Sequence, residues 1–109
     1  MTTVSASETK PWIAEDGRTA SLQVALLKRV YVFPWGQFLY AEGTGDEVRA
    51  AFSTHDVVVK GGGLGALLND LAGQRVSLLR EPARADKFVA GTGSRIVEVS
   101  VQKVDIDAS

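Results

Sequence analysis

The single histidine, His55, stands in the run Ser53-Thr54-His55-Asp56, between hydroxyl and carboxylate neighbours. A histidine oriented by a carboxylate can act as a general base. Adjacent residues of a strand point to opposite faces, so Asp56 can reach the His55 ring only if the backbone turns there. We therefore interpret Asp56 as a turn residue that satisfies its own backbone. His55 remains a candidate for ligand or partner binding, including by symmetry in an oligomer.

A second run with chemical potential is 61–66, with the sequence GGGLGA, which follows an apolar stretch. Gly61, Gly63 and Ala66 occupy the positions of a G-x-G-x-x-G/A fingerprint, and Glu81 follows about 20 residues later, where a ribose-binding acid belongs. This part of the chain resembles the start of a dinucleotide-binding fold. The resemblance implies a pyrophosphate held by backbone amides at a helix N-terminus.

Three features argue against a cofactor site at these glycines. Leu64 to Ala72 allows only about two and a half helical turns, barely enough to carry the chain back across a sheet. The flanking sequence predicts hairpin turns and no second helix, whereas this fold needs parallel strands with helices on both faces. A chain of 109 residues is also too short for two mononucleotide halves. We therefore interpret Gly61–Gly63 as turn and helix-entry residues and predict no cofactor.

Aromatic residues are concentrated in one short part of the chain, at Tyr31, Phe33, Trp35, Phe38 and Tyr40. Because aromatic side chains supply a large contact area at low entropy cost, such a cluster can form a binding surface. A small sheet also uses aromatic residues as its core, and we place Phe38 there. Trp35 stands in a Pro-Trp-Gly turn, so we expect it to be the least fully buried. The candidate ligand- or partner-binding residues are Tyr31, Trp35, Tyr40 and His55.

Composition excludes several classes of function. The absence of cysteine and the single histidine exclude disulfides, thiolate zinc sites, iron–sulfur clusters and multi-histidine metal sites within one chain. The net charge of −1 lacks the basic footprint of a nucleic-acid binder. No apolar run approaches the roughly 20 residues that span a bilayer. The N-terminal residues carry no secretory or lipidation pattern, so we expect a soluble, cytoplasmic protein without metal, nucleic-acid or membrane partners.

Glycine and proline divide the chain into short segments, most of which have strand character. The segments predicted as strands are 30–33, 37–42, 47–53, 57–60, 75–81 and 95–106, whereas 21–29 fits either a strand or a helix. The connection 43–46 contains two glycines and predicts a hairpin loop. The alternation loses phase near His55, so a bulge or tight turn must absorb the slip there. Residues 82–94 are predicted as a long polar loop, in which 83–88 can form a helical turn.

The clearest periodicity predicts one amphipathic helix. Leu64, Leu67, Leu68 and Leu71 recur at i, i+3, i+4 and i+7 and form a single apolar stripe. Gly73, just beyond the stripe, fits a left-handed C-cap.

Short glycine turns between consecutive strands favour antiparallel pairing, because parallel pairing needs a dozen or more connecting residues. We therefore predict an α+β fold: a small, mostly antiparallel curved sheet or partial barrel of about five to six strands, with one short amphipathic helix packed on it. Residues 1–12 are expected to be a disordered tail and 13–109 a single domain.

No motif identifies a reaction, so our leading hypothesis is a non-enzymatic domain that acts through protein contacts. Self-association through a sheet edge or the aromatic cluster would give a homo-oligomer, because an open edge must be covered or paired. The alternative is a small-ligand binding module with a pocket between sheet and helix. An enzyme is the third hypothesis, and it would need His55 or the carboxylates near Asp46 to converge with groups from elsewhere.

Overall fold

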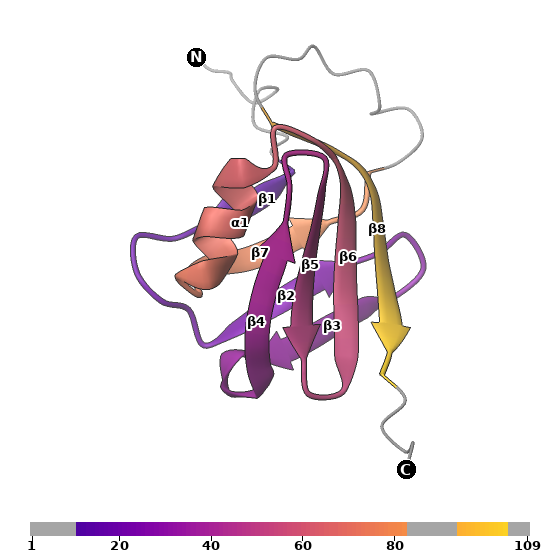
Figure 1. Ribbon diagram of the computed structural model, residues 1–109. Coiled ribbons are helices and arrows are strands. Elements are labelled where there is room, and N and C mark those ends of the chain that lie inside the picture. The colour runs from indigo at the N-terminus through magenta and orange to yellow at the C-terminus, as the bar shows by residue number, and fades with distance from the viewer. Residues whose placement is uncertain (1–10, 83–93, 105–109) are drawn as a thin grey trace, which may run out of the picture.

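The computed structural model describes residues 11–82 and 94–104. Within these ranges, eight strands form two four-stranded sheets and one α-helix packs beside them (Figure 1). The elements in chain order are β1 (Trp12–Ala14), β2 (Ser21–Ala25), β3 (Val30–Pro34), η2 (Trp35–Gln37), β4 (Phe38–Gly43), β5 (Glu47–Phe52), β6 (His55–Gly62), α1 (Gly65–Ala72), β7 (Val76–Arg80) and β8 (Arg95–Lys103). The fold class is α+β, as predicted, with more strands than the sequence suggested.

The two sheets differ in topology. Sheet A has the strand order β1-β7-β2-β3 and contains one parallel pair, β2 with β7. Sheet B has the order β4-β5-β6-β8 and is antiparallel throughout. Figure 1 shows sheet B in front, with sheet A crossing behind it. The sheets are mostly antiparallel, as expected, and do not close into a barrel.

Helix α1 connects the two sheets and does not join parallel neighbours within one sheet. The strand before it, β6, belongs to sheet B, and the strand after it, β7, belongs to sheet A. The strand–helix–strand crossover that a dinucleotide-binding fold requires is therefore absent from this part of the chain. Gly61 and Gly62 end β6, and Gly63 turns the chain into the helix with a φ of 64°. The interpretation as a turn and helix-entry residue is confirmed for Gly63, whereas Gly61 and Gly62 are paired strand residues.

The core lies between the two sheets, and α1 packs against it beside strands β4 and β5. The predicted leucine stripe is confirmed: Leu64, Leu67 and Leu71 are fully buried, and Leu68 packs partly buried against the same core. The largest fully buried side chain is Phe52 of β5, whose ring contacts Phe33, Trp35 and Phe38. One continuous hydrophobic core therefore holds both sheets and the helix together.

Helix α1 ends at Ala72, but the left-handed residue after it comes one position later than predicted. Gly73 keeps a right-handed conformation with a φ of −87°, and the left-handed residue is Gln74, with a φ of 58°. The Gln74 amide donates to the Leu71 carbonyl at 2.9 Å and the Arg75 amide to the Asp70 carbonyl at 3.0 Å. This is a Schellman pattern with glutamine at the position that glycine usually takes. The prediction of Gly73 as a left-handed cap is therefore wrong.

Two bulges change which side chains face the core. The register of β6 with β8 shifts between Lys60 and Gly61, which leaves Val97 as an extra residue. Val97 is therefore exposed, whereas Ile96 and Val99 are buried. Simple alternation along the predicted strand 95–106 would put Val97 on the same face as Val99, but the bulge reverses the alternation at this point.

The second bulge lies in β4. Its register with β5 shifts between Phe38 and Tyr40, which leaves Leu39 as an extra residue. Phe38 packs against the core, as predicted, but Tyr40 lies on the outer face of sheet B. Simple alternation along the predicted strand 37–42 would put Phe38 and Tyr40 on one face, and the bulge separates them.

The ambiguous segment 21–29 contains β2 and the turn into β3, and these two strands pair as a hairpin. The predicted hairpin loop 43–46 connects β4 to β5. A tight turn at Ser53 and Thr54 absorbs the phase slip near His55, as predicted. Trp12, which the sequence placed in the tail, belongs to β1. The helical turn predicted at 83–88 lies outside the described residues. None of the described helices is long and apolar enough to cross a membrane.

Candidate functional site

Two of the predicted site residues, Tyr31 and His55, come together between the edge strand of sheet A and the start of an inner strand of sheet B. Tyr31 lies on β3 of sheet A, His55 begins β6 of sheet B, and their ring centroids are 5.7 Å apart. Phe33 stacks on Tyr31 at 5.6 Å and also lies 5.4 Å from His55. His55 Nδ1 is 2.8 Å from the Thr54 hydroxyl oxygen. The Asp56 carboxylate lies 3.6 Å from Arg49, so the hypothesis of a base oriented by Asp56 finds no support in this arrangement.

Trp35 and Tyr40 lie away from this cluster. Trp35 is only 5% exposed, and its indole N–H donates to the Thr19 hydroxyl at 2.8 Å. The expectation that Trp35 is the least buried aromatic residue is wrong, because the η2 turn directs its ring into the core and Thr19 satisfies its polar atom. Tyr40 is 48% exposed on the outer face of sheet B. The four candidate residues therefore do not form one site.

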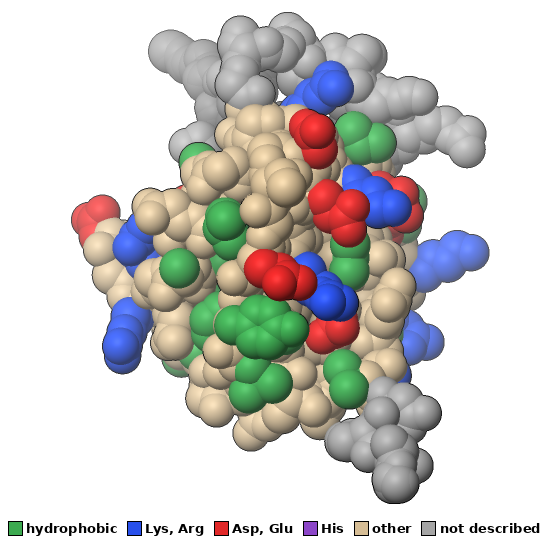
Figure 2. All heavy atoms as spheres, viewed as in Figure 1, with side chains coloured by type: hydrophobic (Ala, Val, Ile, Leu, Met, Phe, Trp, Pro, Cys, Tyr) green, Lys and Arg blue, Asp and Glu red, His purple; other side chains and the backbone are tan. Residues whose placement is uncertain are grey.

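The outer face of sheet B is charged, and several of its charges are paired. Arg49 contacts Glu42 at 3.3 Å and Asp56 at 3.6 Å. Figure 2 shows acidic and basic side chains next to one another on this face, with a group of apolar side chains below them. Mixed, paired charge is typical of a solvated surface.

The outer face of sheet A has a different character. Cross-strand pairing places Ile13, Leu78, Gln23 and Val32 in one row across all four strands. Val32 is 60% exposed, and Val30, two residues earlier on the same strand, is 55% exposed. We call the surface formed by Ile13, Leu78, Val30 and Val32 the apolar face of sheet A. Exposed Gln23 lies between Leu78 and Val32, so the most exposed apolar side chains of this face are the two on β3.

Within residues 11–82 and 94–104, no strand pairs with the outer edge of β3, which borders this face and carries no charged residue in its sequence VYVFP. The other sheet edges differ. Edge strand β8 carries Arg95, Glu98 and Lys103, β1 has only three residues, and β4 has α1 packed against it. Charge, shortness, proline and a covering helix are devices that protect sheet edges from pairing. Among the described edge strands, β3 has neither a charge nor a covering helix, and its one such device is Pro34 at its end.

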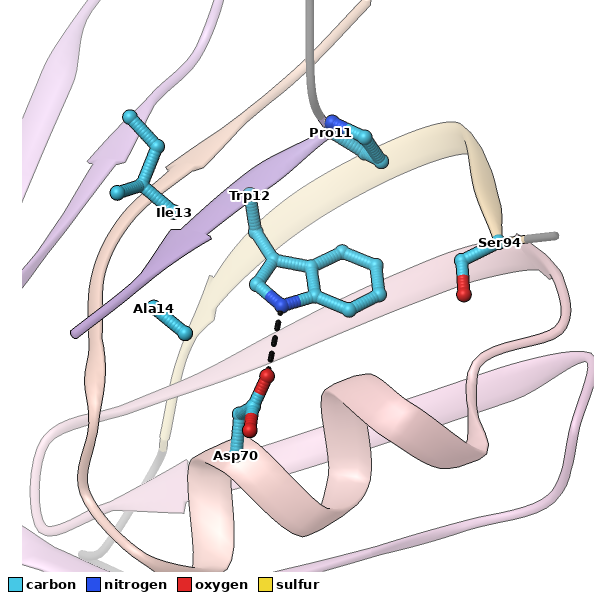
Figure 3. A pocket seen from close by; sticks show the side chains of 6 residues that line it. All are labelled: Pro11, Trp12, Ile13, Ala14, Asp70 and Ser94. Carbon is cyan, nitrogen blue, oxygen red and sulfur yellow. Dashed lines mark hydrogen bonds between the residues drawn. The ribbon is translucent and has the colours of Figure 1, made fainter. Parts of the chain in front are cut away.

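A groove lies between β1 and α1, with a volume of about 340 Å³ (Figure 3). Its lining residues are Pro11, Trp12, Ile13, Ala14, Asp70 and Ser94. The Trp12 indole N–H donates to Asp70 Oδ2 at 3.1 Å, and Arg75 donates to Asp70 Oδ1 at 2.9 Å. Asp70 therefore ties the edge strand of sheet A to the helix and to the start of β7.

Sequence reasoning missed the residues of this groove. Trp12 stands directly after a polar segment that reads as a tail, and its apolar neighbours Ile13 and Ala14 form too short a run to predict a strand. Asp70 lies on the polar side of the predicted helix, where a carboxylate is ordinary. The one available signal was the tryptophan itself, because its large apolar ring is seldom left in a fully solvated tail.

The described part of the chain contains no group of three or more histidine, cysteine or acidic residues placed to hold a metal ion. Of the carboxylates near the 43–46 loop, Glu42 is paired with Arg49. Comparisons of the chain with protein-family models, with curated proteins and with solved structures find no match.

Proposed function

We propose that this protein is a non-enzymatic interaction domain that self-associates through β3 and the adjoining apolar face of sheet A. The observation that supports the proposal best is the uncharged free edge of β3, with Val30 and Val32 exposed beside it. An edge strand presents unpaired backbone N–H and C=O groups, which can pair with another strand.

A second copy of the chain is the partner that this edge fits most simply. Antiparallel pairing of β3 with its copy about a two-fold axis at Val32 places Val32 opposite itself and Val30 opposite Pro34. The two sheets A would then form one continuous sheet, and their apolar faces would lie side by side. Pro34 has no backbone N–H, so the ladder is short, and we expect a dissociation constant on the order of 10 μM.

Val32→Lys tests this proposal. A lysine on the exposed side of β3 would place two like charges opposite each other at the two-fold axis, so we expect the dimer dissociation constant to rise at least about tenfold. The matched control is Leu39→Lys, which replaces a side chain that is 62% exposed on β4 of sheet B. Sedimentation velocity of the wild type and both variants, up to about 100 μM, measures the effect.

We expect the wild type and Leu39→Lys to dimerise over the same concentration range, and Val32→Lys to dimerise only at concentrations at least about ten times higher. A wild type that stays monomeric throughout would contradict the proposal. Equal weakening by both lysine substitutions would place the contact elsewhere and would also contradict it.

A further inference from the structure

We propose that the groove between β1 and α1 is a binding site for a small organic cation, such as an amidinium or a protonated amine carried on a ring or a short hydrocarbon. The site is independent of the proposed self-association, because β1 and β3 are the two opposite edges of sheet A. The proposal depends on three properties of the groove: the fixed orientation of its aromatic ring, the hydrogen-bonding capacity of its polar side chains, and its apolar walls.

The Trp12 ring is held in one orientation before any ligand binds. Its indole N–H is bonded to Asp70, and Asp70 is itself held by Arg75. Figure 3 shows the six-membered part of the ring directed along the groove on the side of Ser94. A ring fixed in this way loses little conformational entropy when a ligand packs on it.

The polar side chains of the groove can accept hydrogen bonds but have no free proton to donate. The Trp12 N–H is used by Asp70, and the Ser94 hydroxyl donates to the Gly63 carbonyl at 2.6 Å. Asp70 is an acceptor, and its carboxylate has about four lone-pair positions, of which the two bonds from Trp12 and Arg75 use only part. A ligand that bonds to these side chains must therefore supply the donors.

The walls of the groove favour a cation over an anion of the same shape. Pro11 and Ala14 provide apolar surface beside the Trp12 ring, whereas the Ile13 side chain points away from the groove (Figure 3). The negative face of an indole attracts cations, and tryptophan is the aromatic residue that does so best. The Asp70 carboxylate adds negative charge at one end, although Arg75 compensates part of it. A volume of about 340 Å³ fits a ligand of about ten non-hydrogen atoms.

The experiment is an NMR titration of the full chain with benzamidinium, followed by the indole N–H signals. The chain has two tryptophans, so the buried Trp35 serves as an internal reference for Trp12. We expect a saturable shift of the Trp12 signal with a dissociation constant of about 1 mM, which is usual for a ligand of this size. Benzoate, which has the same shape and the opposite charge, should bind at least about tenfold more weakly.

Two variants test the assignment of the polar groups. Asp70→Asn should weaken benzamidinium binding about tenfold, because it removes the negative charge. Asp56→Asn is the matched control on the outer face of sheet B and should leave binding unchanged. Ser94→Ala should weaken binding about threefold through loss of one acceptor, and it keeps the test valid if Asp70→Asn alters the helix. Val32→Lys should bind as the wild type does, which separates this site from self-association.

Three results would overturn the proposal. The first is the absence of a saturable Trp12 shift up to about 10 mM benzamidinium. The second is binding of benzoate as tight as that of benzamidinium, and the third is unchanged binding in both Asp70→Asn and Ser94→Ala.

Discussion

Replacing Phe52 by alanine is expected to lower the free energy of unfolding by about 4 kcal/mol, the middle of the range for deleting a large buried aromatic ring. Phe52 is 1% exposed, and its ring lies 4.8 Å from Phe33, 5.5 Å from Phe38 and 5.7 Å from Trp35. These rings come from β3, β4, β5 and η2, so Phe52 joins sheet A to sheet B. Its removal leaves a cavity between the two sheets that the surrounding strands cannot easily close.

Urea unfolding followed by circular dichroism measures this effect. Phe52→Leu should lose about 1.5 kcal/mol, because most of the apolar volume remains. Leu39→Ala, at an exposed bulge position, should change the unfolding free energy by less than about 0.5 kcal/mol. A loss below about 1 kcal/mol for Phe52→Ala would show that the two sheets do not share this aromatic contact.

Gly61→Ala is expected to destabilise the protein by about 3 kcal/mol, the upper part of the usual range for overpacking. A Cβ atom at Gly61 would overlap the carbonyl oxygen of Arg95 and would lie 2.9 Å from the Cα of Ile96. Both neighbours are backbone atoms of β8, beside the bulge at Val97, and a strand held by its ladder cannot move away as a side chain can. Accommodating the methyl group therefore requires β8 to separate from β6 at this end.

Gly36→Ala is the matched control, because a Cβ atom there meets nothing within 4 Å. We expect its unfolding free energy to equal that of the wild type or to exceed it by up to about 1 kcal/mol, since alanine restricts the unfolded chain. The same urea unfolding measurement compares the two variants. Equal stability of Gly61→Ala and Gly36→Ala would mean that β8 does not approach Gly61 closely.

Sequence reasoning predicted the features whose signals are local. The leucine stripe of α1 repeats with the period of a helix, and the 43–46 loop has the glycines of a hairpin. The phase slip near His55 pointed to the tight turn before β6. Each of these depends on residues close together in the chain, so periodicity and turn chemistry are sufficient to find them.

Features that depend on distant residues were not predictable in this way. The parallel pairing of β2 with β7 joins segments separated by about half of the chain, such as Gln23 and Leu78. The bulges at Leu39 and Val97 reverse the alternation on which the assignment of buried faces relied. Nothing in the local sequence distinguishes an extra residue in a strand from an ordinary one, because the bulge is defined by the partner strand.

The same limit applies to the candidate sites. Tyr31 and His55 lie on strands of different sheets, and they meet because the two sheets pack together. No spacing in the sequence reveals this contact. Trp35 was expected at the surface because it follows a proline, but the Thr19 hydroxyl allows its indole to be buried. The groove at Trp12 depends on a hydrogen bond to Asp70, 58 residues away in the chain.

Self-association through β3 is tested most directly by hydrogen–deuterium exchange at two protein concentrations, about 1 μM and about 200 μM, on either side of the expected dissociation constant. If β3 mediates self-association, peptides covering Val30–Pro34 exchange more slowly at the higher concentration. Peptides covering the edge strands β4 and β8 of sheet B exchange at the same rate at both concentrations. Exchange of Val30–Pro34 that does not depend on concentration, or slowing confined to β4 or β8, would contradict self-association through β3.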